Sequence, residues 1–374
     1  MSAIQASDSL PRWASVALLP LINLAVAFFI SGLVIVAVGE NPFAALTALA
    51  WGAVGTHEAI GYTLYYTTNF VFTGLAVAIA FHAGLFNIGG EGQAYIGGLG
   101  VALLCLAAGD LPFAVVLPLA IVAAALFGAG WAFIPAWLQA KRGSHIVITT
   151  IMFNFIATAL MTYLLVNVMI KPGQQSPETR EFASQTWLPF AHEIMAAIGV
   201  EISRSPLNMS FAWALLCCVM FQVYVWRTRW GYALRALGAN ETAAVYAGIR
   251  PARTIIVAMA ISGALAGFVA LNEIMGVHHR LLLNFSSGYG FVGIAVALMG
   301  RNHPVGVFLA ALLFGALYQG GAELAFEMPT LTREMVVVIQ GLIIVLCGAL
   351  ENMFKPTLAR LLRRPPGLAA AATG

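Results

Sequence analysis

Long apolar runs, separated by short polar segments, recur along almost the whole chain and determine its class of fold. The first run, residues 14–38, is far longer than the roughly 7 to 15 residues of a signal-peptide core, so it predicts a retained membrane span. Of the 374 residues, 61% are hydrophobic and only 9% are charged, with a mean hydropathy of +0.89. A soluble domain of this size cannot cover so much apolar surface, and lipid must therefore solvate most of the chain.

The lengths of these runs predict an all-α polytopic membrane protein with about ten transmembrane helices. A helix needs roughly 20 apolar residues to cross a hydrocarbon layer of about 30 Å. The run at 39–59 is broken by Asn41 and Pro42, and we expect at most an interfacial segment there. The expected spans are 14–38, 60–82, 88–109, 113–140, 145–169, 209–226, 254–275, 286–300, 304–326 and 335–353.

The positions of the 18 Lys and Arg residues predict the orientation of these spans. With ten crossings and both termini in the cytoplasm, most of the basic residues fall on the cytoplasmic side, as the positive-inside rule requires. The expected organisation is a cytoplasmic N-terminus (1–13), a transmembrane domain (14–353) and a cytoplasmic tail (354–374). An external loop covers 170–208, and a basic cytoplasmic region covers 227–253. The net charge of +3 is too small to indicate a nucleic-acid partner.

Glycine interrupts two of the predicted spans. Seven glycines crowd residues 84–100, and three more lie within 288–293. Glycine weakens a helix and exposes backbone amides, which a membrane tolerates only where protein covers them or a wet cavity solvates them. The two segments have opposite orientations in the predicted topology, a pattern typical of inverted repeats around a midplane pathway. The same pattern can also arise from two unrelated Gly-rich stretches.

Polar and aromatic residues near these segments are candidates for a solute pathway. Glu91 is the lone intramembrane carboxylate among the candidates; it could line a pathway, or it could bond to the amides of a broken helix. Neutral donors and acceptors nearby could instead form ordinary interhelical hydrogen bonds, and the aromatic rings could stack on a flat solute or pack against lipid. These further candidates are Phe86, Asn87, Gln93, Asn154 and Phe291.

The sequence lacks the motifs of several kinds of chemistry. The only lysines are Lys141, Lys171 and Lys355, and none follows the glycine pattern of a phosphate loop, so ATP-driven work would need a partner chain. The seven histidines show no zinc motif, and the four cysteines lie within apolar runs, so we expect no metal site, no disulfide framework and no cofactor.

Residues 81–93, FHAGLFNIGGEGQ, closely resemble the glycine-rich signature of ATP-binding cassette (ABC) importer permeases of the branched-chain amino acid and simple-sugar superfamily, and more narrowly its nucleoside-uptake branch. Residues 148–154, 235–249 and 290–300 resemble the same branch, whereas His145 departs from its pattern. The resemblance implies a non-enzymatic transport subunit of a bacterial inner membrane. It also implies an ABC ATPase subunit, a second homologous permease chain and an external substrate-binding lipoprotein as partners, besides membrane lipid.

The resemblance further implies that 235–249 is a coupling segment seated on the ATPase. The residues it assigns to this role are Arg235, Gly238, Asn240, Glu241, Ala244, Tyr246 and Gly248. A nucleoside suits the candidate lining, but a simple sugar or riboflavin would suit it nearly as well. An ion-coupled secondary transporter is a weaker alternative because it would usually carry more intramembrane carboxylates than Glu91. A membrane-embedded enzyme would need clustered titratable groups, which the predicted spans lack.

Overall fold

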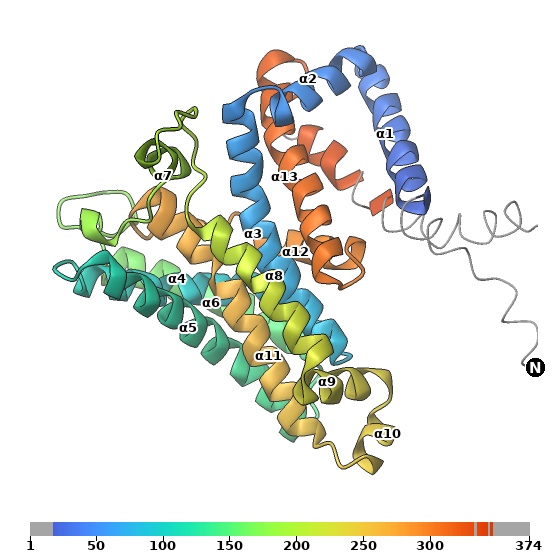
Figure 1. Ribbon diagram of the computed structural model, residues 1–374, viewed down its shortest axis with the longest axis vertical. Coiled ribbons are helices and arrows are strands. Elements are labelled where there is room, and N and C mark those ends of the chain that lie inside the picture. The colour runs from blue at the N-terminus through green and yellow to red at the C-terminus, as the bar shows by residue number, and fades with distance from the viewer. Residues whose placement is uncertain (1–17, 333–334, 343–344, 347–374) are drawn as a thin grey trace, which may run out of the picture. The chain divides into compact units, whose positions relative to one another are not determined.

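The structure is a computed structural model that describes residues 18–332, 335–342 and 345–346. Its regular elements are helices, and the only β-contacts in this part of the chain are two isolated bridges. The all-α prediction is therefore confirmed (Figure 1). The α-helices are α1 (Leu19–Ala37), α2 (Pro42–Val54), α3 (His57–His82), α4 (Gly90–Ala107), α5 (Phe113–Arg142), α6 (Ile146–Asn167), α7 (Ala191–Ala197), α8 (Ser210–Arg227), α9 (Arg229–Ala239), α10 (Glu241–Tyr246), α11 (Pro251–Gly267), α12 (Tyr289–Met299) and α13 (Pro304–Glu327); a 3₁₀ turn, η3 (Ser184–Thr186), and a π-helix, η4 (Leu271–His278), complete the set.

Six of these elements are long and apolar enough to cross a membrane, and α1 with α2 could add a seventh. The six are α3, α5, α6, α8, α11 continued by η4, and α13. Helices α1 and α2 differ in direction by 119°, so the run at 39–59 does not continue the first span, as expected. The short, glycine-rich α12 has only 11 residues and rises about 17 Å, too little to cross. Of the predicted span 335–353 the structure describes 335–342 and 345–346. Helices α4 and α12, from the predicted spans 88–109 and 286–300, are not among the six, and the count of ten stays a prediction.

The chain divides into two compact units, residues 1–49 with 321–374 and residues 50–320. The larger unit contains every candidate site residue. At its centre α3 is buried along most of its length and contacts α8, α11 and α12. Helices α4, α5 and α11 form the other main packing group of this unit (Figure 1).

Small residues let α4, α5 and α11 approach one another closely. A Cβ added to Gly128 of α5 would lie 2.2 Å from the carbonyl oxygen of Gly263 in α11, and one added to Gly97 of α4 would lie 2.5 Å from the Cα of Gly267. Membrane helices associate through such contacts because lipid tails are as apolar as leucine and give no hydrophobic drive. This packing fixes the position of α4, which carries the candidate pathway residues.

Candidate functional site

The glycine-rich segment breaks the helical path between α3 and α4. Helix α3 ends at His82, α4 begins at Gly90, and residues 83–89 are not helical. Gly84 has φ +73°, a left-handed conformation that favours glycine. Most of this irregular backbone is nevertheless shielded by protein, which confirms the expectation that the break faces the bundle interior.

Asn87 holds the break together from inside. Its Nδ2 donates to Oε1 of Gln93 at 3.0 Å and to Oγ of Ser262 in α11 at 2.8 Å, while its Oδ1 accepts the amide of Gly89 at 2.8 Å. Asn87 and Gln93 are both buried. Their polar groups are satisfied by protein partners, so in this conformation they fix the irregular backbone and do not face a path.

Asn154 joins the same break to α6. Its Oδ1 accepts the amide of Gly92 at 2.9 Å, and its Nδ2 donates to the carbonyl oxygen of Ile88 at 2.9 Å. The side chain thus replaces backbone hydrogen bonds that the interrupted helix cannot make for itself. The structure therefore brings three of the predicted polar residues, Asn87, Gln93 and Asn154, into one buried cluster.

Glu91 connects the two glycine-rich segments. Its Oε1 accepts hydrogen bonds from Oγ of Ser286 at 2.6 Å and from the amide of Gly288 at 3.0 Å, and its Oε2 accepts the amide of Gly290 at 2.8 Å. These amides lie at the start of α12, where a helix has unsatisfied N–H groups and a positive dipole end. Glu91 is half-buried, and its carboxylate acts as a cap supplied by another helix.

The two segments also touch through their backbones. A Cβ on Gly290 would lie 2.2 Å from the amide nitrogen of Glu91 and 2.6 Å from the carbonyl carbon of Gly90. Helices α4 and α12 therefore meet at their N-terminal ends, and the meeting point requires glycine. Their common origin as an inverted repeat stays a prediction.

The two aromatic candidates for stacking on a solute lie in different surroundings. Phe86 stacks on Phe81 with ring centroids 5.2 Å apart, whereas Phe291 is 49% exposed on α12. The described ring contacts include none between Phe86 and Phe291. Tyr95 of α4 stacks on Phe285, just before Ser286, with ring centroids 5.3 Å apart, and the Tyr95 hydroxyl donates to Oδ1 of Asn284 at 2.8 Å.

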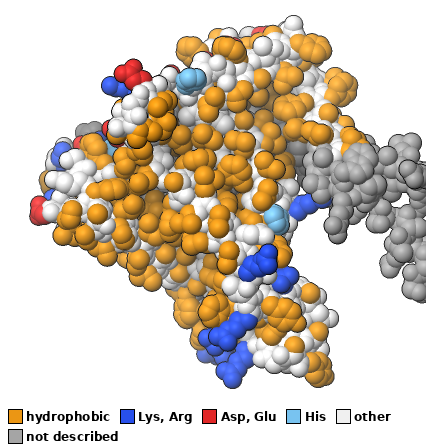
Figure 2. Space-filling view, viewed as in Figure 1, with side chains coloured by type: hydrophobic (Ala, Val, Ile, Leu, Met, Phe, Trp, Pro, Cys, Tyr) orange, Lys and Arg blue, Asp and Glu red, His pale blue; other side chains and the backbone are white. Residues whose placement is uncertain are grey.

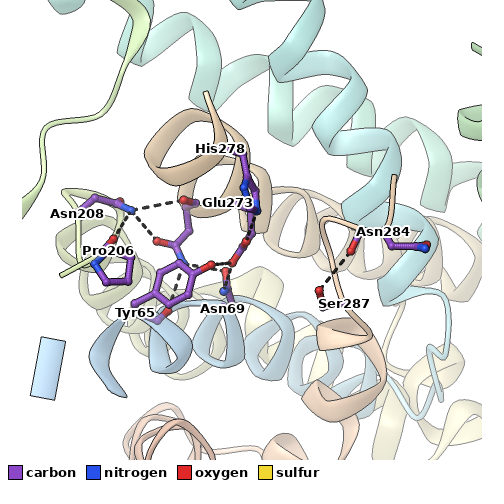
Figure 3. Close-up of polar contacts among 9 residues, drawn as sticks. Tyr65, Asn69, Pro206, Asn208, Glu273, His278, Asn284 and Ser287 are labelled. Atoms are coloured by element: carbon purple, nitrogen blue, oxygen red, sulfur yellow. Dashed lines mark hydrogen bonds and ion pairs between the residues drawn. The ribbon is translucent and has the colours of Figure 1, made fainter. Parts of the chain in front are cut away.

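A second buried carboxylate was missed. Glu273 lies in η4, is only 2% exposed, and accepts hydrogen bonds at Oε1 from the Tyr65 hydroxyl at 2.7 Å and from Nδ2 of Asn69 at 2.5 Å (Figure 3). Nε2 of His278 lies 3.5 Å from its Oε2. The view that Glu91 is the only intramembrane carboxylate was therefore wrong. The signal was available, because Glu273 falls inside the predicted span 254–275.

The residue before Glu273 ties the long loop to the bundle. Oδ1 of Asn272 accepts from Nδ2 of Asn208 at 2.9 Å and from Oγ of Ser210 at 2.8 Å, and its own Nδ2 donates to Oδ1 of Asn69 at 3.0 Å. Figure 3 shows Asn208 reaching this cluster from the end of the loop. The segment 170–208 is thus anchored on η4 by buried amides.

The rest of that loop packs on the residues after η4. The Trp187 ring stacks on the His279 ring with centroids 4.0 Å apart, and Arg280 pairs with Glu178 at 3.0 Å. Burial of His279 lowers its pKa below the usual value of about 6.5, although a 3.2 Å contact with the Met275 carbonyl and the charge of Glu181 partly offset this effect.

This lowered pKa predicts that the loop loosens in acid. The unfolded chain binds a proton at His279 more readily than the native chain, so the stabilisation is complete above about pH 6.5 and is lost as the pH falls below it. Hydrogen-exchange protection of the Trp187 region, corrected for the slower intrinsic exchange in acid, should therefore fall between pH 7.5 and 5. In His279→Asn, which removes the titrating ring and tolerates the left-handed φ of 53°, this pH step should vanish. Equal steps in both proteins would contradict the assignment.

The implied coupling residues form α9, α10 and the turns around them. Oδ1 of Asn240 caps α10 by accepting the Ala243 amide at 2.9 Å, and Gly248 ends the turn after α10 with φ +79°. Glu241 stands in the first turn of α10, where a negative charge is favourable. Ala244 is buried, which fixes α10 on the rest of the chain, whereas Tyr246 is 89% exposed.

Gly238 links this region to the broken helix. A Cβ on Gly238 would lie 2.3 Å from the carbonyl oxygen of His82 and 2.9 Å from the amide nitrogen of Gly84. The end of α9 therefore rests directly on the end of α3, immediately before the break. Arg235, one turn earlier in α9, is half-buried at the same end of the helix.

Comparisons with known proteins give the family of the chain. Residues 59–348 match the family described as the branched-chain amino acid transport system permease component. The chain is 36% identical over 325 residues to the guanosine ABC transporter permease protein NupP of Bacillus subtilis, covering 86% of this chain and 91% of that protein. It is 33% identical over 307 residues to the nucleoside ABC transporter permease protein NupB of Lactococcus lactis, covering 81% and 83%.

A third relative carries a different solute name. The chain is 31% identical over 339 residues to the glucose ABC transporter permease protein TsgB13 of Haloferax volcanii, covering 90% of this chain and 88% of that protein. No solved structure matches the chain. The resemblance to ABC permeases is confirmed, and the chain belongs to the branched-chain amino acid transport system permease family.

Proposed function

We propose that this chain is the membrane-spanning subunit of an ATP-driven importer of nucleosides. The observation that carries the solute class is the identity of 36% and 33%, over most of the chain, to permeases named for guanosine and for nucleosides. A sugar importer is the second candidate because the relative named for glucose is 31% identical over a similar length. ATP binding and hydrolysis belong to a separate partner chain.

The proposed pathway passes the meeting point of α4 and α12. Glu91 is half-buried there and Phe291 is exposed beside it, so both could contact a solute in this conformation. Phe86 is also partly accessible at the break. The three buried polar residues are Asn87, Gln93 and Asn154. We assign them the role of stabilising the irregular backbone at 83–89 in this conformation. They would line the pathway only when α4 and α12 separate.

The proposed coupling route begins at the exposed face of α10. An ATPase seated on Tyr246 would move α10 and α9 as one body, because Ala244 is buried and Asn240 joins the two helices. The Gly238 contact with the end of α3 would pass that movement to the break before Gly90. Two discrete packings of α4 against α12 would then give the two access states.

The remaining partners and the location follow from the same family. We infer a second homologous permease chain, an external substrate-binding lipoprotein, and a place in the bacterial inner membrane with both termini in the cytoplasm. The basic residues of 227–253 support this orientation. The loop 170–208, on the opposite side in that topology, is the surface available to the lipoprotein.

Uptake measurements test the proposed solute and energy source. Cells that lack the chain should lose accumulation of labelled guanosine, and restoring the chain should restore it only while ATP is present. Labelled glucose and riboflavin serve as parallel solutes in the same cells. Chain-dependent uptake of glucose without guanosine would select the sugar importer, and uptake that survives ATP depletion but follows an ion gradient would contradict the ABC mechanism.

Replacing Glu91 by glutamine tests the pathway assignment. The glutamine oxygen can still accept two hydrogen bonds, but its amide group would face the Gly290 N–H, so a donor would meet a donor. We expect guanosine uptake to fall by roughly tenfold, the equivalent of about 1.4 kcal/mol. Glu58→Gln, an exposed residue in the first turn of α3, is the matched control. Unchanged uptake in Glu91→Gln would remove Glu91 from the pathway.

Replacing Tyr246 by alanine tests the coupling surface. The ring is 89% exposed, so its loss should leave the chain folded, but an exposed aromatic at an interface centre carries much of the binding energy. We expect co-purification of the ATPase to drop by tenfold or more, on the order of 2 kcal/mol. Tyr232→Ala on α9, where the ring is 61% exposed, is the control. Equal ATPase recovery with both variants would place the docking surface elsewhere.

A further inference from the structure

A basic hollow lies where the end of α8, the start of α9 and the start of α11 meet. Its volume is about 460 Å³, and three of its lining residues are Arg229, Arg250 and Arg253. No Asp or Glu is among the described residues that line it. In Figure 2 blue side chains gather at the lower end of the view, near α9, α10 and the start of α11.

The charges of the hollow favour an anion. All three arginines are exposed, and none of them belongs to an ion pair recorded in the described part of the chain. The first turn of α11, which carries Arg253 and Thr254, lines the hollow, and no side chain caps the start of this helix. Its free N–H groups add to the positive potential of the guanidinium groups.

The walls of the hollow favour a lipid over a small soluble anion. Tyr224 and Val257 belong to the apolar spans α8 and α11, and the Trp230 ring on α9 is 57% exposed beside them. Tryptophan and tyrosine are typical of the headgroup level of a membrane. The hollow therefore runs from a cationic mouth to an apolar wall, whereas an inorganic anion would need only the mouth.

We propose that this hollow binds one anionic phospholipid, with the lipid phosphate on Arg229, Arg250 and Arg253 and the glycerol and first acyl carbons along Tyr224, Trp230 and Val257. The inference needs only that α8 and α11 span a membrane, and it is independent of the solute that the chain transports. A lipid held there would contact α9 at Trp230 and the turn after α10 at Gly248 and Ile249, and it would stiffen the region that we assign to coupling.

Lipid titration of the purified full chain tests the proposal. The chain in a neutral detergent is titrated with phosphatidylglycerol, with phosphatidylcholine of the same acyl chains, and with inorganic phosphate, and bound species are counted by native mass spectrometry. We expect one saturable phosphatidylglycerol, at least tenfold weaker phosphatidylcholine, and no retained phosphate. The double variant Arg250→Gln/Arg253→Gln should weaken phosphatidylglycerol binding by roughly thirtyfold, since each basic residue contributes about fivefold near a membrane surface.

Matched variants separate a built site from general charge. Arg204→Gln/Arg227→Gln removes the same two charges from exposed positions outside the hollow and should leave binding unchanged. Arg250→Lys/Arg253→Lys keeps the charge and should retain most of the affinity. Equal binding of the two lipids, equal weakening by the control pair, or retention of inorganic phosphate as tight as that of phosphatidylglycerol would each overturn the proposal.

Discussion

Replacing Gly290 by valine should abolish uptake and destabilise the larger unit, because the new side chain would enter the backbone of α4. Its Cβ would lie 2.2 Å from the amide nitrogen of Glu91 and 2.6 Å from the carbonyl carbon of Gly90. Neither atom belongs to a flexible side chain, so the two helices would have to move apart. Overpacking of this kind costs about 3 kcal/mol. The same shift would pull the Gly288 and Gly290 amides away from the Glu91 carboxylate.

The melting temperature of the purified chain and guanosine uptake together measure this effect. Gly130→Val is the control, since a Cβ on that exposed glycine of α5 meets nothing within 4 Å and the substitution adds the same side chain. We expect the Gly130 variant to melt near the wild-type temperature and the Gly290 variant to melt several degrees lower. Wild-type stability and uptake in Gly290→Val would mean that α4 and α12 do not cross at this point.

Most helices were predictable because local sequence determines them, and apolar runs of about 20 residues predict spans. The interruption expected inside 88–109 was wrong, because α4 runs unbroken from Gly90 to Ala107 and the irregular backbone lies before it, at 83–89. The length of α12 was harder to predict, since Ser286 and Ser287 belong to the predicted span 286–300 but precede the helix. These polar residues belong to the turn at 283–288 that precedes Tyr289.

The partners of the carboxylates were not predictable from sequence. Glu91 bonds to groups about 200 residues further along the chain, and Glu273 bonds to Tyr65 and Asn69, more than 200 residues before it. No period or motif relates such positions. The alternatives for Glu91 stayed open for this reason, and the geometry favours amide bonding while leaving the carboxylate half-buried beside Phe291.

The contacts of Glu91 and Glu273 should respond differently when the helices move during transport. Glu91 joins α4 to α12 through hydrogen bonds to backbone amides and one hydroxyl, which can be exchanged for water if the helices part. Glu273 is enclosed and joins η4 to α3 through side chains. We therefore expect the Glu91 contact to change during transport and the Glu273 contact to persist as a fixed joint.

Replacing Glu273 by leucine should be the most destabilising single change in this joint. It would leave the Tyr65 hydroxyl and the Asn69 amide buried without their acceptor, and each such group costs about 1–3 kcal/mol. Glu273→Gln keeps one acceptor oxygen and should lose about half as much stability. At about 2–4 °C for each kcal/mol, Glu273→Leu should melt on the order of 10 °C lower than wild type.

The double variant Glu273→Leu/Tyr65→Phe distinguishes this cause from a general loss of charge. Removing the unpaired hydroxyl should recover part of the lost melting temperature, because replacing both partners of a buried hydrogen bond costs less than replacing one. Glu201→Leu removes a carboxylate at an exposed position and should change the melting temperature very little. If Glu273→Leu melted like Glu201→Leu, Glu273 could not be the joint between α3 and η4. Uptake by Glu273→Gln then distinguishes a structural joint from a contact that takes part in transport. A joint that only stabilises the fold should leave the solute affinity of the surviving protein unchanged.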